Sequence, residues 1–341
     1  MKAAVTGATG FIGRHLCDEL LGRGDSVSAL VRDRRAADVL TRRGISAVHG
    51  DLMDEEALCR LCSNADVVFN LAGALGKWGT SAEEMELVNV RAVDSLVRCA
   101  ARFGARKVVH TSTAGVSGPL PDGVSASEEY PPRPATIYQR TKLAGERAAL
   151  EAHRELGIPL VVVRPAFVYG PGDMHKLSLF QAIAAGRMIL VSGGVSSPWR
   201  IHPVFVDDLV SGMLCAAERA AGSGEVYILG GAGPVTVRKL VETIAWALAV
   251  PAPKLSLPGG LLLSLARFTE MACAIARREP PLTCSRVKLL SENYAYSIDK
   301  ARRELKFKPV VDLPEGARRA VEWYMGRGLL GSSRRGDRRV G

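Results

Sequence analysis

A tyrosine and a lysine stand four residues apart in the segment IYQRTK, where Tyr138 precedes Lys142. In a helix, positions i and i+4 lie on one face, so the two side chains can meet. A phenol has an ordinary pKa of about 10, but a nearby ammonium favours the phenolate and lowers that pKa. This pair therefore predicts acid–base chemistry on an alcohol or a carbonyl group.

A threonine precedes this helix, at the end of an apolar segment that ends in TSTAG. The hydroxyl of Thr113 could hydrogen-bond a substrate oxygen and hold it near Tyr138. Ser112 is the alternative if the assignment shifts by one residue. We expect Thr113, Tyr138 and Lys142 to form the catalytic set.

Three glycines lie three residues apart near the start of the chain, in AAVTGATGFIGRHL. Gly7, Gly10 and Gly13 follow a short apolar run and precede a segment with helical spacing. A strand, glycine turn and helix let the backbone approach a pyrophosphate at the helix N-terminus. The spacing GxxGxxG differs from the GxGxxG of many dehydrogenases, and a tight turn without a ligand is the alternative.

Arg32 follows the second expected strand, where an acidic residue would receive the adenosine ribose hydroxyls. An arginine suits a 2′-phosphate better, and Arg34 and Arg35 lie close by. This pattern favours NADP over NAD as the cofactor. The alternative is that Arg32 is an ordinary solvated charge.

Apolar strands alternate with helical segments along the first half of the chain. Such alternation predicts an α/β fold with a doubly wound parallel sheet, whose ligands bind beyond the carboxyl ends of the strands. The expected strands lie within 2–6, 25–33, 45–52, 65–73, 105–115 and 158–172, and the long helices within 11–24, 83–104 and 138–157.

The composition limits the classes of function. The chain has 341 residues, 47% of them hydrophobic, and a formal net charge of +10. This charge favours an anionic partner, but no groove-reading motif or basic patch with interleaved aromatics indicates nucleic acid.

Cys59 and Cys62 form an isolated CxxC, so we expect helix packing and no metal site. No apolar stretch is long enough to span a membrane, and the scattered cysteines suit a reducing, cytoplasmic location.

Several further motifs carry a family resemblance. In combination, TGATGFIG, GDL, NLAG, TSTAGVSG, YQRTK, RPAFVYGPGD and VFVDDL resemble the extended short-chain dehydrogenase/reductases of the NAD-dependent epimerase/dehydratase family, from residue 1 to about 325. The resemblance implies a Rossmann-type fold in which Tyr138 is the catalytic acid/base, Lys142 tunes it and holds the nicotinamide ribose, and Thr113 takes the usual Ser/Thr position. The implied cofactor-binding residues are Gly7, Thr9, Gly10, Phe11, Ile12, Gly13, Arg32, Asp51, Leu52, Leu71, Ala72, Gly73, Thr111, Tyr138, Lys142, Pro165, Ala166 and Val168.

Some sequence motifs of this chain differ from those of other family members, and these differences restrict the class of substrate. Thr113 is followed by Ala114 and Gly115 rather than by the carboxylates of the dehydratases, and the arginine patterns of nucleotide-sugar epimerases are incomplete. The apolar segment 255–276 resembles the corresponding part of 3β-hydroxysteroid and sterol 4-carboxylate dehydrogenases. We therefore expect hydride transfer to or from a secondary alcohol or ketone on a bulky, sterol-like ring. The alternatives are a nucleotide-sugar epimerase with bound NAD and a catalytically silent NAD(P)-binding sensor or assembly subunit.

The domain organisation follows from the same resemblance. We expect a Rossmann domain over 1–169 to which 204–230 returns, a smaller mixed substrate lobe formed by 170–203 and 231–326, and a basic flexible tail over 327–341. The helices at 82–103 and 138–156 resemble those that pair in homodimers of the family. Segment 255–276 is expected to be a lid or core helix, or to contact a membrane surface peripherally.

Overall fold

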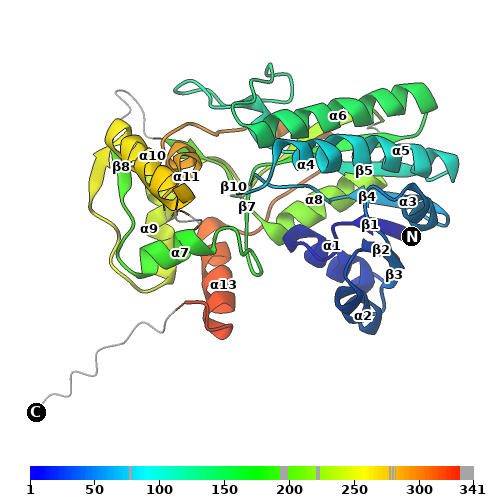
Figure 1. Cartoon of the computed structure of the whole chain (residues 1–341), viewed down its shortest axis with the longest axis horizontal. Helices are drawn as coiled ribbons and strands as arrows, with labels where there is room; N and C mark the ends of the chain where they lie inside the picture. The colour runs from blue at the N-terminus through cyan, green and yellow to red at the C-terminus, as the bar shows by residue number, and fades with distance from the viewer. Residues whose placement is uncertain are drawn as a thin grey trace, which may run out of the picture.

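A seven-stranded parallel sheet forms the centre of the molecule (Figure 1). The computed structural model describes residues 1–76, 79–192, 199–219, 223–275, 278, 280 and 282–330. The sheet order is β11-β6-β5-β4-β1-β2-β3, so the winding reverses between β1 and β4. The strands are β1 (Lys2–Thr6), β2 (Ser26–Val31), β3 (Ser46–His49), β4 (Val67–Asn70), β5 (Lys107–Thr111), β6 (Leu160–Pro165) and β11 (Glu225–Leu229).

Helices cover both faces of this sheet because its strands present apolar side chains in both directions. Val5 and Val109 face one core, whereas Ala4 and Val108 face the other. The first face is covered by α1 (Phe11–Gly22), α2 (Arg34–Arg42) and α8 (Val206–Glu218), and the second by α3 (Glu55–Cys62), α5 (Ala92–Arg102) and α6 (Ile137–Leu156). The predicted doubly wound α/β fold is confirmed.

The helix expected over 83–104 is interrupted. It consists of α4 (Ala82–Glu86), a π-helical turn at Leu87–Arg91 and α5. At this turn the backbone lies against α6 so closely that a Cβ added to Gly145 would be 1.8 Å from the carbonyl oxygen of Asn89. The apolar periodicity of the sequence predicts a helix but does not show whether one of its turns contains an extra residue. Such π-turns are often found at functional sites.

The rest of the chain forms a smaller mixed α/β lobe. Its short paired strands are β7 (Phe167–Tyr169) with β10 (Pro203–Phe205), β9 (Arg200–Ile201) with β12 (Val235–Thr236), and β8 (Leu190–Ser192) with β13 (Ser256–Pro258). Its helices are α7 (Leu177–Ala184), α9 (Val237–Ala247), α10 (Gly259–Ile275), α11 (Cys284–Leu290) and α13 (Leu313–Gly326). Helix α12 (Asp299–Glu304) packs instead on β11, in the core on the first face of the sheet. Phe180, Ile244 and Tyr324 form part of the separate core of this lobe.

Helix α13, the last one among the described residues, packs closely against β7. A Cβ added to Gly316 of α13 would lie 2.2 Å from the phenol oxygen of Tyr169. Tyr324 donates a hydrogen bond to the carbonyl of Asp173, and the carboxylate of Asp208 in α8 accepts the N–H groups of Val310 and Val311 at 2.9 and 3.0 Å. Residues 310–324 therefore join the lobe to α8 and β7.

The structure bears on three further expectations, which concern the C-terminal tail, membrane-spanning helices and the division into domains. Of the predicted tail, Leu330 is buried in the lobe, and 331–341 lie outside the described residues. Within the described part of the chain, no helix is both long and apolar enough to cross a bilayer. The predicted division at 169, 204 and 230 stays a prediction, although β11 pairs with β6 and α8 packs on the sheet.

Candidate active site

The glycine turn between β1 and α1 is packed backbone against backbone. Gly7 has a φ of 74°, a left-handed conformation that glycine adopts without strain. A Cβ there would lie 2.8 Å from the nitrogen of Ala72, and one on Gly13 would lie 2.1 Å from the carbonyl oxygen of Gly7. Glycine is thus required for the turn to contact both α1 and the end of β4.

The N-terminus of α1 offers uncapped amide groups. Its N-cap residue is Gly10, no side chain caps the helix, and no acidic residue lies in the first turn. The unpaired N–H groups and the positive end of the helix dipole favour an anion at this position. The turn therefore fits the pyrophosphate of a dinucleotide.

A buried chain of polar side chains crosses the carboxyl ends of β1, β4 and β5. Thr6 donates to the side-chain oxygen of Asn70 at 2.7 Å and accepts the N–H of Ala72 at 3.2 Å. Asn70 in turn bonds His110 Nδ1 at 3.1 Å. Burial, followed by the charge of Lys142, lowers the pKa of His110 well below its ordinary value. His110 is therefore neutral at pH 7, and the network fixes the loop that contains Leu71, Ala72 and Gly73.

Lys142 reaches from α6 to the end of β5. Its ammonium donates a 2.6 Å hydrogen bond to the carbonyl oxygen of Thr111. A Cβ added to Gly73 would lie 3.7 Å from this ammonium, so the β4 loop also borders it. Burial lowers the pKa of Lys142 to about 8, although Glu146 opposes the shift.

The effect of the lysine on Tyr138 differs from the sequence expectation. Burial raises the pKa of Tyr138 to about 12. An ammonium beside the phenol would instead lower this pKa. The physical reason is that desolvation penalises the phenolate, while the Lys142 ammonium is directed to the Thr111 carbonyl. Tyr138 is therefore a protonated phenol at neutral pH.

Thr113 initiates the short 3₁₀ turn Ala114–Ser117 that follows β5. Its hydroxyl oxygen accepts the N–H of Gly115 at 3.2 Å, which leaves its own proton available to donate. Two neighbouring hydroxyls, of Thr111 and Ser112, are buried and have no hydrogen-bond partner among the described residues. Polar capacity thus concentrates where β5 ends.

Two positioning side chains are absent from the predicted set. Asn89, in the π-turn, donates to the Ala74 carbonyl at 3.0 Å and accepts the Ala74 N–H at 2.9 Å; it also donates to Thr141 at 3.0 Å. Gln139 closes a capping box with Thr136, accepting its N–H at 3.2 Å, at the start of α6. The sequence signals are an asparagine on the apolar face of 83–104 and the TxxQ spacing just before the tyrosine.

The remaining predicted residues surround the same edge of the sheet. Arg32 and Asp51 follow β2 and β3, and their side chains lie 3.5 Å apart with Arg32 79% exposed. Leu52 adjoins Asp51, and Thr9, Phe11 and Ile12 lie in the glycine turn and the start of α1. Beyond β6, Ala166 donates its N–H to Leu229 at 2.9 Å, between Pro165 at the strand end and Val168 in β7. The predicted cofactor-binding residues thus lie at the carboxyl ends of β1 to β6, where a doubly wound sheet binds its ligands.

Comparison with known proteins gives relatives over almost the whole chain. The chain is 33% identical over 325 residues to the 4-hydroxy-2-methyl-3-oxo-4-farnesyl-3,4-dihydroquinoline-1-oxide ketoreductase of Stigmatella aurantiaca, which covers 93% of this chain and 94% of that protein. It is 30% identical over 341 residues to sterol demethylase protein B of Methylococcus capsulatus, with 97% and 100% covered. Among solved structures, MoeE5 in complex with UDP-glucose and NAD aligns with a TM-score of 0.74 and 26% identity, over 96% of this chain and 100% of that one.

A family model agrees with these relatives and with the site. The model of the NAD dependent epimerase/dehydratase family matches residues 3–230, a span that includes the central sheet except for Lys2 at the start of β1. The predicted family is confirmed. The chain belongs to the NAD-dependent epimerase/dehydratase family and is an enzyme of the extended short-chain dehydrogenase/reductase type.

Proposed function

We propose that this protein reduces a ketone on a bulky, largely apolar ring substrate, reversibly, with NADP(H) as the cofactor. The observation that carries the proposal is the 2.6 Å hydrogen bond from the Lys142 ammonium to the Thr111 carbonyl oxygen. Lys142 lies one helical turn after Tyr138, and Thr111 lies two residues before Thr113. When bound, the nicotinamide supplies or accepts the hydride.

Tyr138 is proposed as the group that gives its proton to the carbonyl oxygen. Its raised pKa of about 12 keeps the phenol protonated at neutral pH, which is the form needed for reduction. The hydroxyl of Thr113, whose oxygen already accepts the Gly115 N–H, donates its proton to the same substrate oxygen and orients it. Lys142, whose ammonium bonds the Thr111 carbonyl, is proposed to hold the ribose side of the site.

The substrate class is proposed from the smaller lobe and from the relatives. In α10, Leu261, Leu265, Phe268 and Met271 are exposed, whereas Leu262 and Ala266 of the same helix pack against Val287 of α11. Among the described residues, one side of α10 is thus an exposed apolar face. The two relatives in the comparison have names that specify a farnesylated quinoline oxide and a sterol. We propose that the lobe of 170–203 and 231–326 receives a lipid-like ring and that α10 contacts a lipid surface peripherally.

The preference for NADP is proposed from Arg32. The side chain is largely exposed, follows β2 and lies 3.5 Å from Asp51, a contact that solvent screens. An adenosine 2′-phosphate would offer this guanidinium a stronger, bidentate partner. NAD remains the cofactor that the family name specifies.

A homodimer through the helices at 82–103 and 138–156 is also proposed. An open pocket of about 620 Å³ lies on the outer surface of α4 and α6, and Ile137 and Ala144 contribute apolar groups to it. A second copy of these helices would cover the pocket. Light scattering on the wild type and on Ala144→Arg tests this, since the arginine is expected to shift a dimer toward monomer.

The function is tested by mixing the purified protein with NADPH or NADH and a panel of hydroxysteroids, oxosteroids and UDP-sugars. Net consumption of NADPH with an oxosteroid supports the proposal. Conversion of a UDP-sugar to its epimer without net change in cofactor favours the epimerase instead. Cofactor binding with no turnover of any member of the panel points to a silent binding protein.

A further inference from the structure

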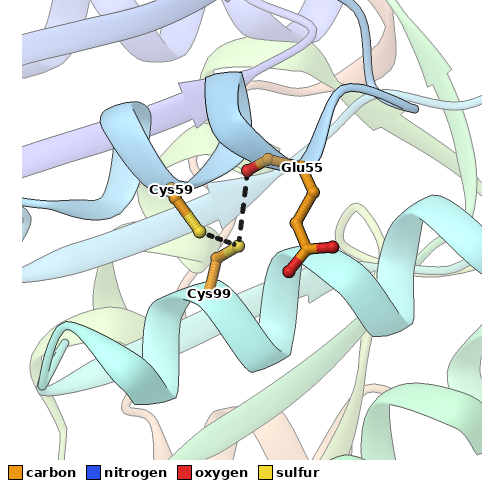
Figure 2. A group of neighbouring side chains, drawn as sticks. All are labelled: Glu55, Cys59 and Cys99. Atoms are coloured by element: carbon orange, nitrogen blue, oxygen red, sulfur yellow. Dashed lines mark hydrogen bonds between the residues drawn. The ribbon is translucent and has the colours of Figure 1, made fainter.

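Two cysteines from different helices meet on the second face of the sheet, away from the proposed active site. Figure 2 shows Cys59 of α3 and Cys99 of α5 directed toward one another, with the two sulfur atoms 2.7 Å apart. Cys99 also contacts the backbone carbonyl of Glu55 at 3.8 Å. The CxxC partner in the sequence, Cys62, is fully buried in the core. The packing of α3 on α5 therefore selects Cys99 as the partner of Cys59.

The spacing of the sulfur atoms distinguishes between a metal site and a disulfide. The carboxylate of Glu55 and the two thiols lie within 4.8 Å of one another and could in principle ligate a metal. Two thiolates on a tetrahedral zinc ion, however, lie about 3.8 Å apart because each Zn–S bond is about 2.3 Å long. A disulfide needs about 2.05 Å. The observed sulfur–sulfur distance of 2.7 Å is closer to the disulfide value than to the zinc value. The two sulfur atoms therefore have to move less to form a covalent bond than to bind zinc.

Access to the pair comes from the side of Cys59. Cys59 is half-buried and lines an open pocket of about 570 Å³ together with Arg60, Ser63 and Phe103. Cys99 is buried, and this burial raises the pKa of its thiol well above the ordinary value. A small molecule in the pocket would therefore meet the sulfur of Cys59 first, with Cys99 behind it.

We propose that Cys59 and Cys99 form a reversible disulfide by exchange with a low-molecular-weight disulfide that enters the pocket at Cys59. The Cys59 thiolate attacks one sulfur of the small disulfide, a mixed disulfide forms, and one small thiol leaves. The sulfur of Cys99 then attacks the sulfur of Cys59 and releases the second small thiol. The protein loses two protons and two electrons, and the small disulfide is reduced to two thiols.

The test uses the full-length reduced protein, incubated in its native state with mixtures of reduced and oxidised glutathione, quenched with acid and mapped by mass spectrometry after alkylation. The expected product is a peptide pair joined through Cys59 and Cys99 that disappears on reduction. The cross-link closes a loop between residues 40 positions apart, so the oxidised protein is expected to melt up to about 8 °C higher than the reduced one.

Matched variants separate this pair from the other thiols. Cys59→Ser is expected to abolish the cross-link and the shift in Tm, whereas Cys215→Ser, which removes a half-buried thiol of α8, leaves both unchanged. The wild-type map needs no variant, so it remains decisive if Cys59→Ser fails to fold. The proposal is overturned if Cys59 pairs with Cys62, if glutathione adducts at Cys59 never resolve, or if the reduced wild type retains one zinc ion that Cys59→Ser loses.

Discussion

Lys142 and Thr111 are joined by a 2.6 Å hydrogen bond from the buried ammonium to the backbone carbonyl at the end of β5. This bond fixes the first long helix after β5 to the strand that continues into Thr113. Tyr138 lies one turn earlier in the same helix. The proposed mechanism depends on this link between helix and strand.

Replacing Tyr138 with Phe is expected to lower kcat for ketone reduction by about 10²–10⁴-fold, because the proton donor is lost while the ring remains. Dinucleotide affinity, measured by the quenching of protein fluorescence, should change little. Tyr130→Phe removes the hydroxyl of a half-buried tyrosine in the preceding loop and serves as the control. Full activity in Tyr138→Phe would exclude the proposed acid.

Gly13→Ala is expected to abolish dinucleotide binding and to destabilise the protein by several kcal/mol. Its Cβ would stand 2.1 Å from the Gly7 carbonyl, so the turn would have to open. Gly22→Ala, at the other end of the same helix, meets no atom within 4 Å and should be neutral or stabilise by up to about 1 kcal/mol. Isothermal titration and urea unfolding of both variants provide the comparison, and equal behaviour would contradict the role of the turn.

Arg32→Asp is expected to weaken NADPH binding at least about tenfold and to leave NADH binding unchanged or improved. The carboxylate repels a 2′-phosphate but can accept hydrogen bonds from ribose hydroxyls. Arg42→Asp, on the exposed end of α2, controls for the change in net charge. Unchanged selectivity in Arg32→Asp would mean that this arginine does not read the phosphate.

The apolar face of α10 predicts binding to vesicles of anionic phospholipid. Phe268→Ser, at a side chain that is 68% exposed, is expected to reduce the sedimented fraction about tenfold, in line with the free energy of burying one aromatic ring. Trp246→Ser, at an aromatic side chain of α9 that is 62% exposed, is the control. If the wild type stays in the supernatant, the proposed lipid contact is wrong.

His110 makes the protein less stable in acid. Its folded pKa lies well below the ordinary value, so the unfolded chain binds a proton below about pH 6.5 that the folded chain refuses. Stability therefore falls as the pH drops through this range, by up to about 1.4 kcal/mol per pH unit from this one group. His110→Gln should flatten the dependence between pH 6.5 and 5 in urea unfolding, and His49→Gln, an exposed histidine, should not. The same slope in all three proteins would assign the acid sensitivity to other groups.

The sequence predicts the sheet and the position of the site because both depend on local patterns. The apolar strands, the glycine turn and the i, i+4 spacing of Tyr138 and Lys142 are all visible in short stretches. The π-turn at Asn89 is not, because it results from the contact between Asn89 and Gly145 across two helices. The raised pKa of Tyr138 likewise depends on burial by neighbours that are distant in sequence.

The pairing of Cys59 with Cys99 shows the same limit. A CxxC directs attention to the two cysteines within one helix, but Cys62 is buried in the core, whereas Cys59 is half-buried. The sulfur that Cys59 contacts is 40 residues away and is set by the packing of α3 on α5. The sequence gives the number of cysteines but does not show which of them are close in space.

The tight closure of α13 on Tyr169 has a consequence for how the protein is made. During synthesis on the ribosome, the central sheet emerges long before Gly316, and the surface of Tyr169 that α13 contacts stays uncovered until residues 313–326 are released. A shortened fragment prepared for crystallography or ligand screening would carry that exposed aromatic surface unless it kept residues 313–326. The nascent chain can therefore complete this packing only after residues 313–326 have left the ribosome.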